Sequence, residues 1–507
     1  MQNSKRVIVN TIAQYTRTVI NMLLSLYVVR IVLITLGASD YGIYSVVAGV
    51  TAMLAFITNA LVQTTQRYMS FYQGQNNMVK MKEVFSNSEF LHLIIGGLLV
   101  VVLLALKPLL FNGFLSIDAE RIDAAKYVYQ IVIVTLFITF CTAPFRSLLI
   151  SHENIVYISI IDVLDGVLRV IVVTLLTYVS FDKLVMYAIF LLGIQLFNFI
   201  AFSWFSFKKY EECILPRISL FSKSYFKELS SFAGWVIYGT GCYIFRNQGV
   251  AIVINKVLST AANAAYGVGQ HISVAVSTVS GSLMNAMIPQ IVKAEGAGNR
   301  TKMLSLATVL CKFSFFLLTA LCIPCVFEMP NLLQLWLKDV PDYTVLFARM
   351  AMIAAMADTL TGGLHYANDA VGKLKNYHLV VSTLKLLTLP LSAIFMYMGY
   401  APILIAVCFV GTEFIAALVR LPFLHKTSGL IVSDFIKSVL CRELIPLVVT
   451  ISICFACVSF IDWEWRFLIT FSVSILFYAI VIWLIGLNRQ ERTMISSMVF
   501  KKLHQKK

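Results

Sequence analysis

Several arginines lie inside long apolar segments of this sequence, where a charged side chain needs a specific reason. Arg17 shares its segment with Gln14 and Asn21, and Arg246 is followed directly by Asn247. A charge at the centre of a bilayer costs about 2.5–3.5 kcal/mol on insertion scales. Guanidinium groups bind phosphate through paired hydrogen bonds, and amides add further donors and acceptors. We therefore expect these five residues to bind an anionic, phosphate-bearing substrate.

The polar residues of the first apolar segment share one face of the predicted helix. They follow one another at steps of four, three, four and four: Asn10, Gln14, Arg17, Asn21 and Ser25. Such a stripe is expected to line a cavity or to contact another helix rather than lipid. Arg30 falls on the opposite side of the same helix. It either contributes to substrate binding or extends its side chain to the membrane interface.

Acidic residues are fewer than basic ones inside the apolar segments. The cations are Arg17, Arg30, Arg169, Arg246, Lys312, Arg349 and Lys385, and the acids are Asp162, Asp165, Asp358 and Glu413. The positive surplus suits an anionic ligand and disfavours a pump for cationic drugs. A binding role for Arg17 and Arg246 loses its basis if both are neutralised by carboxylates.

The acids themselves allow two interpretations. Asp165 and Arg169 are four residues apart and are predicted to pair on one helix, and Lys385 is predicted to pair with Glu413. Alternatively, Asp162 and Asp165 couple transport to protons or sodium ions.

The composition explains why these charges must be judged against a membrane. The chain has 507 residues, of which 59% are hydrophobic and 13% charged, and its mean hydropathy is +0.84. Soluble domains are about half apolar and about a quarter charged. Apolar runs of about 20 residues recur along nearly the whole chain, separated by short connectors. The sequence thus predicts an all-α integral membrane protein of about fourteen transmembrane helices.

The basic residues outside these runs set the topology. The formal net charge is +15, and lysine and arginine are concentrated in the connectors on the side of both termini. This bias predicts cytoplasmic termini, and it points to lipid headgroups rather than nucleic acid as partners. No Walker A pattern occurs, the loops are short, and the cysteines lie mostly in apolar runs. We therefore expect no catalytic site, no metal and no cofactor.

An internal duplication organises the chain. The turn Leu36-Gly37-Ala38-Ser39-Asp40-Tyr41-Gly42 has a counterpart in the segment 258–268, and Gln73-Gly74-Gln75-Asn76 has one in Gly296-Ala297-Gly298-Asn299. The offset of about 225 residues covers an even number of helices, so the repeats keep the same orientation. We predict two six-helix bundles related by an axis along the membrane normal. The predicted parts are 1–207, a cytoplasmic linker at 208–228, 229–425, and 426–507 with two further helices and a basic tail.

The N-terminal segment resembles a known family. The stretch from Arg30 to Tyr44, after a helix that opens Val9-Asn10-Thr11, is similar to the N-terminal signature of bacterial polysaccharide transporters. These are the O-antigen and capsule repeat-unit flippases of the multidrug/oligosaccharidyl-lipid/polysaccharide (MOP) superfamily. Many members carry Arg three residues before the glycine that matches Gly37, where this chain has Ile34.

The resemblance implies a fold, a substrate and a location. The fold would be a MATE-like pair of bundles around a cationic lumen. The substrate would be an oligosaccharide repeat unit linked through pyrophosphate to undecaprenol. It would move from the cytoplasmic to the periplasmic leaflet of the bacterial inner membrane by ion-coupled or potential-driven alternating access. Partners would be this lipid-linked oligosaccharide, membrane lipids and other polysaccharide-assembly proteins.

Three other classes remain as alternatives. A multidrug exporter of the same superfamily normally has twelve helices and an acid in the lumen. A membrane glycan-processing enzyme usually needs a large outer loop or a polar catalytic cluster. A major-facilitator transporter would carry an Asp-Arg-x-Gly-Arg pattern, which the loop at 66–88 lacks.

Overall fold

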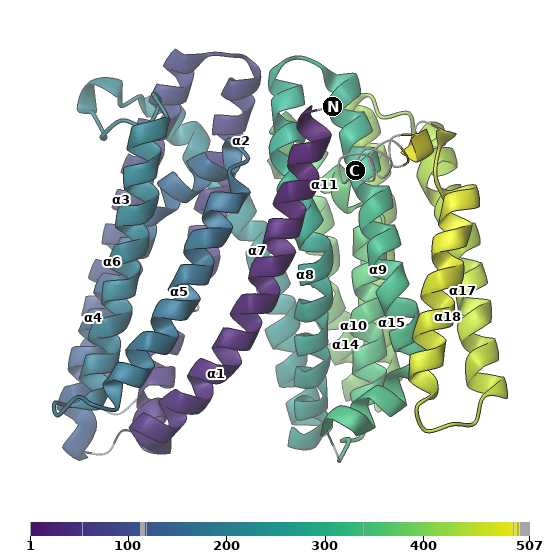
Figure 1. Ribbon diagram of the computed structural model, residues 1–507, viewed down its shortest axis with the longest axis horizontal. Coiled ribbons are helices and arrows are strands. Elements are labelled where there is room, and N and C mark those ends of the chain that lie inside the picture. The colour runs from purple at the N-terminus through teal and green to yellow at the C-terminus, as the bar shows by residue number, and fades with distance from the viewer. Residues whose placement is uncertain are drawn as a thin grey trace, which may run out of the picture. The chain divides into compact units, whose positions relative to one another are not determined.

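The described chain folds into helices, most of them long (Figure 1). The computed structural model describes residues 2–52, 54–111, 117, 119–337, 339–489, 491–493 and 496, and within them it contains no strand. An all-helical arrangement is the expected solution for a chain in lipid, because each helix satisfies its own backbone hydrogen bonds. The predicted all-α membrane fold is confirmed.

The chain forms two compact units, and each unit consists of two separate stretches of the sequence. The first comprises Met1–Thr240 and Ile288–Asn299, and the second comprises Gly241–Met287 and Arg300–Lys507. The chain therefore passes from the first unit to the second within α7 (Lys223–Val257), and it returns to the first unit within α8 (Thr260–Gly296). The domain boundaries suggested by the sequence, with a linker at 208–228, stay a prediction.

The first unit is built mainly from six helices. They are α1 (Gln2–Ala52), α2 (Ala55–Gly74), α3 (Met78–Leu109), α4 (Ile122–Ser151), α5 (Ile155–Leu176) and α6 (Lys183–Lys209). Short 3₁₀ turns precede α4 at Ala119–Arg121 and α7 at Ile218–Leu220.

The second unit contains the remaining helices. They are α9 (Arg300–Leu337), α10 (Thr344–Thr359), α11 (Gly362–Val371), α12 (Leu374–Tyr377), α13 (Thr383–Leu386), α14 (Thr388–Tyr397), α15 (Ile403–Ser428), α16 (Val432–Phe435), α17 (Cys441–Phe460) and α18 (Arg466–Val481). π-helical turns at His378–Ser382 and Ile436–Leu440 join α12 to α13 and α16 to α17, and a third at Ile482–Gly486 follows α18.

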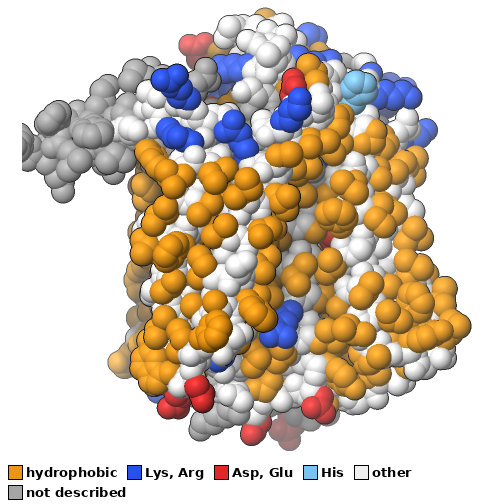
Figure 2. Space-filling model, turned by 90° about the vertical axis from the view of Figure 1, so that its right-hand side faces the viewer, with side chains coloured by type: hydrophobic (Ala, Val, Ile, Leu, Met, Phe, Trp, Pro, Cys, Tyr) orange, Lys and Arg blue, Asp and Glu red, His pale blue; other side chains and the backbone are white. Residues whose placement is uncertain are grey.

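Ten helical segments of the described chain are long and apolar enough to cross a membrane, or eleven if the bent pair α10 and α11 forms one span. α5 is also long enough at 22 residues, but it carries Asp162, Asp165 and Arg169. The predicted number of about fourteen stays a prediction. On the face drawn in Figure 2, hydrophobic side chains cover a broad band, with most of the visible Lys and Arg gathered at its upper edge and most of the visible Asp and Glu at its lower edge. The chain is a multi-pass membrane protein.

The glycine of the signature turn breaks α1. Gly37 has φ 78° and ψ 167°, a backbone conformation that is essentially restricted to glycine. A helix runs into this residue and another leaves it, so the kink divides α1 into two segments. The turn residue predicted from the sequence thus has a conformational reason.

The aspartate of the same turn is held by an arginine from another part of the first unit. Asp40 accepts hydrogen bonds from Arg121 Nε at 2.8 Å and Nη2 at 2.6 Å, and Arg121 Nη1 also donates to Asp182 at 2.6 Å. Asp182 caps α6 by accepting from the N–H groups of Leu184 and Val185. Burial raises the pKa of Asp182, but the hydrogen bonds from Arg121 and Val185 outweigh it, so the pKa lies below its ordinary value.

Replacing Gly37 with alanine is expected to destabilise the protein by about 1–3 kcal/mol, because a Cβ strains this backbone conformation. The measurement is the thermal unfolding midpoint in detergent. Gly42→Ala is the matched control, since Gly42 lies in the same turn region, has helical backbone and leaves open space for a Cβ. Equal midpoints for the two variants would contradict the role given to Gly37.

The C-terminal hairpin of α17 and α18 is fastened to α9 near both ends. Glu328 of α9 accepts from Arg466 Nε at 2.9 Å and from Thr470 Oγ1 at 2.7 Å. Towards the other end, Lys312 Nζ of α9 lies 2.7 Å from Glu491. The two helices left over from the sequence duplication are therefore part of the second unit.

Candidate functional site

A cluster of two arginines and one aspartate joins α1, α4 and α5 inside the first unit. Arg17 Nη1 donates to Asp162 Oδ2 at 2.6 Å. Arg146 binds both oxygens of the same carboxylate, at 2.9 and 2.8 Å. Asn21, one helical turn beyond Arg17, donates to the backbone carbonyl of Asp162 at 3.2 Å. Two guanidinium groups on one carboxylate leave the cluster with one excess positive charge.

The remaining predicted residues of the first unit are arranged differently. Gln14 is buried in α1, whereas the Arg30 side chain is exposed. Asp165 accepts from Arg169 Nε at 2.6 Å, as the spacing of four residues predicted, and also from Asn198 at 2.7 Å. The structure therefore brings Arg17, Asn21 and Asp162 together and leaves Arg30 outside their cluster.

A larger network lies among α7, α10, α13 and α15 in the second unit. Arg246 Nη1 lies 2.5 Å from Glu413 Oε1, and Lys385 Nζ lies 2.7 Å from Glu413 Oε2. Lys385 and Arg420 both contact Asp358 Oδ1, each at 2.7 Å. The predicted pairing of Lys385 with Glu413 is confirmed. Three cations and two carboxylates again leave one excess positive charge.

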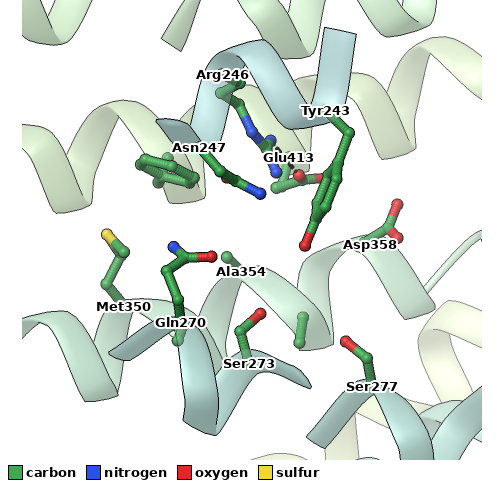
Figure 3. Close-up of a pocket in the computed structure, with 13 residues that line it drawn as sticks. Tyr243, Arg246, Asn247, Gln270, Ser273, Ser277, Met350, Ala354, Asp358 and Glu413 are labelled. Carbon is green, nitrogen blue, oxygen red and sulfur yellow. Dashed lines mark hydrogen bonds and ion pairs between the residues drawn. The ribbon is translucent and has the colours of Figure 1, made fainter. Parts of the chain in front are cut away.

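Arg246 and Asn247 line a small cavity in this unit. Its volume is ≈ 70 Å³. Arg246 and Asn247 of α7 lie across the cavity from Gln270 and Ser273 of α8 (Figure 3). Within the described part of the chain, Arg246 Nε and Asn247 Oδ1 are buried and have no hydrogen-bond partner. Unsatisfied polar atoms in a polar cavity offer hydrogen bonds to a ligand or to water.

Both arginines on which the sequence argument depends are thus paired with carboxylates. An isolated neutral pair would remove the reason to assign Arg17 and Arg246 to an anion. The excess cation in each cluster retains it, because a positive charge that is buried or partly buried without its own counter-ion is costly, and an incoming anion lowers that cost. The binding role of these residues therefore depends on the second cation of each cluster.

Sequence reasoning missed those additional cations, Arg146 and Arg420. Neither residue is among the cations that the sequence places inside the apolar segments. In the structure Arg146 lies within α4 and Arg420 lies buried within α15. One available signal was the spacing of Thr135, Thr139, Thr142 and Arg146, at steps of four, three and four, which defines a polar face of one helix.

Several solved structures of MATE and MOP superfamily transporters are similar to the chain. The MATE transporter ClbM in complex with Rb⁺ superposes with a TM-score of 0.71 at 16% identity, covering 83% of this chain and 94% of that one. A MATE transporter in its straight conformation gives 0.70 at 15% identity, with 86% and 97% covered. A MOP superfamily transporter from Pyrococcus furiosus gives 0.66 at 13% identity, with 85% and 96% covered. These likenesses establish the MATE/MOP fold.

The sequence itself matches a protein family over more than half of its length. No curated protein sequence matches the chain significantly. The family described as polysaccharide biosynthesis protein matches residues 5–295, which include the signature turn, the Arg17 cluster and Arg246. The chain therefore belongs to the polysaccharide biosynthesis protein family.

Proposed function

We propose that the chain is a flippase for an undecaprenyl-pyrophosphate-linked oligosaccharide repeat unit. It moves this lipid from the cytoplasmic to the periplasmic leaflet of the bacterial inner membrane, for O-antigen, capsule or similar surface polysaccharides. Membership of the polysaccharide biosynthesis family supports the substrate class. The fold supports alternating access, driven by a coupled ion or by the membrane potential.

The observation that carries the proposal is the excess of cations over carboxylates among the directly ion-paired groups of each cluster. One cluster contains Arg17, Arg146 and Asp162, and the other is the network around Arg246 and Glu413. Guanidinium groups suit a pyrophosphate because their donors match its oxygens in pairs. Gln14, Asn21 and Asn247 add polar groups along the same helices, and Arg30 contributes if its exposed side chain reaches the substrate.

The carboxylates have a role in the same proposal. Asp162 and Glu413 hold the arginines while no substrate is bound, so neither unit buries its full positive charge unpaired. Asp162 and Asp165 are also the proposed candidates for ion coupling.

Membrane lipids and other polysaccharide-assembly proteins are the proposed partners. The basic edge visible in Figure 2 supports cytoplasmic termini.

The multidrug-exporter alternative has the same fold, so the fold does not separate the two functions. The charge of the binding region does. The Pyrococcus furiosus transporter is described as having a binding pocket of reverse polarity that suggests a different function. A surplus of cations disfavours cationic drugs as the substrate here.

The test is complementation of a flippase-deletion strain with Arg17→Ala and Arg246→Ala variants. We expect surface polysaccharide to fall roughly tenfold or more, since the loss of charge-assisted hydrogen bonds costs about 1.5–3 kcal/mol. Arg349→Ala is the control, because Arg349 Nε donates to the Val326 carbonyl and lies outside both clusters. Normal polysaccharide levels with well-expressed cluster variants would refute the assignment.

A further inference from the structure

The first unit contains a second, larger cavity away from its charged cluster. Its volume is ≈ 300 Å³, and it is lined by residues of α1, α2, α4 and α6. This volume is at the lower end of the range for small-molecule pockets, about 300–1,000 Å³. The polar lining consists of one phenol, three hydroxyls and one amide: Tyr44, Thr58, Thr135, Thr139 and Asn59. No described lining residue is charged.

One of these hydroxyls is buried without a hydrogen-bond partner in the part of the chain that the structure describes. Thr58 is 7% exposed as a residue, and its Oγ1 has no hydrogen-bond partner in the described part of the chain. Leaving a buried polar group unpaired costs about 1–3 kcal/mol. Thr135 and Thr139 each donate to a backbone carbonyl one turn earlier, so their oxygens still have capacity to accept. The cavity therefore offers hydrogen bonds to a neutral ligand rich in hydroxyl or amide groups.

The cavity is connected to the cationic cluster through one face of α4. Thr139 and Arg146 are both on α4, and a spacing of seven residues puts them on the same face about 10 Å apart along the axis. Thr142 lies between them on that face and faces Gln195 of α6 at 3.4 Å. Arg146 binds the carboxylate that also pairs with Arg17. A single ligand with a phosphate at one end and neutral hydroxyls at the other would match this sequence of groups.

We propose that the cavity between α1, α2, α4 and α6 binds an uncharged sugar residue of the lipid-linked oligosaccharide. This inference rests on the proposed flippase function and extends it to a subsite. The phosphate-binding groups select the carrier, whereas the hydroxyl and amide groups select a neutral sugar, such as an N-acetylhexosamine. An acidic sugar would meet no described cation in this lining.

The test compares two probes on the purified full chain by isothermal titration calorimetry. One probe is farnesyl diphosphate, and the other is the same prenyl diphosphate carrying one N-acetylglucosamine. We expect the sugar to increase wild-type affinity about tenfold. Thr139→Val, Thr58→Val and Asn59→Ala are each expected to lose most of that increase and to leave the affinity for farnesyl diphosphate unchanged.

Thr174→Val is the matched control for Thr139→Val. Both hydroxyls donate to the carbonyl four residues earlier at 2.9 Å, but Thr174 is exposed on α5 and lies outside the cavity lining. Equal sugar-dependent affinity in these two variants overturns the sugar subsite. Wild-type binding of farnesyl diphosphate without any gain from the sugar also overturns it and leaves the phosphate site standing. Failure of wild type to bind either probe overturns the proposed function together with the subsite.

Discussion

Replacing Gly296 with alanine is expected to lower the stability of the folded protein by about 3 kcal/mol or more. A Cβ on Gly296 would overlap the backbone carbonyl oxygen of Phe71 in α2. Overpacking against side chains typically costs about 1–3 kcal/mol, and here the obstacle is a backbone atom that no rotamer change can move. The thermal unfolding midpoint in detergent measures the effect, and surface polysaccharide in the deletion strain is expected to fall with it.

The contact between α2 and α8 includes a second glycine in an equivalent position. A Cβ on Gly74 would overlap the carbonyl oxygen of Lys293 in α8. Gly74 is the last residue of α2 and Gly296 is the last residue of α8, and Phe71 and Lys293 each lie three residues before the glycine of their own helix, so the two contacts are equivalent. Each repeat therefore contributes one glycine that allows close approach of the other repeat's helix. Gly74→Ala is expected to reproduce the loss caused by Gly296→Ala.

An ion pair and a hydrogen bond lie beside the contact between α2 and α8. Lys293 Nζ lies 2.8 Å from Glu153, whose backbone carbonyl accepts from Asn10 of α1 at 2.9 Å.

Gly281→Ala is the control for Gly296→Ala, since Gly281 lies in α8 with open space around its missing Cβ. Similar midpoints for Gly281→Ala and Gly296→Ala would show that close packing at this crossing does not limit stability.

The second large effect concerns the buried pair of Arg246 and Glu413. Glu413→Gln is expected to cost about 3–5 kcal/mol, because it leaves Arg246, Lys385 and Arg420 with a single carboxylate at a site where the Arg246 and Glu413 side chains are 5% and 6% exposed. Arg246→Met is expected to cost less, since Lys385 still pairs with Glu413 and two cations then face two carboxylates. The double variant Arg246→Met, Glu413→Gln is expected to recover much of the stability, because no buried charge of that pair is left.

A measurement of transport by this double variant distinguishes a structural role of Arg246 from a binding role. The double variant has the same net charge in the network as the wild type, but it lacks the guanidinium donors of Arg246. We expect it to fold and still to fail in complementation, with surface polysaccharide reduced roughly tenfold or more. The measurements are the unfolding midpoint, the membrane abundance and the polysaccharide level of all four members of the cycle. Full recovery of both stability and transport would assign Arg246 to a structural pair alone.

The sequence by itself determined the class of protein and its local pairs. Apolar runs separated by short connectors specified a helical membrane chain, since lipid leaves few other options. The pairing of Asp165 with Arg169 followed from a spacing of four residues on one helix, and that of Lys385 with Glu413 from similar depth in adjacent segments. The duplicated glycine motifs were visible in the sequence, although nothing there indicated that they contact each other's helices.

Only the tertiary structure decided which distant residues share a cluster. Arg17 and Asp162 come from helices far apart in the sequence, and Arg146 and Arg420 are not among the cations that the sequence places inside the apolar segments. The cavity around Thr58 had no signal in the sequence, because its lining comes from four helices. Hydropathy and spacing define the depth and the face of a side chain on its own helix. The rotation and neighbours of that helix are set by packing between segments distant in sequence, so the partners of its charges are set there as well.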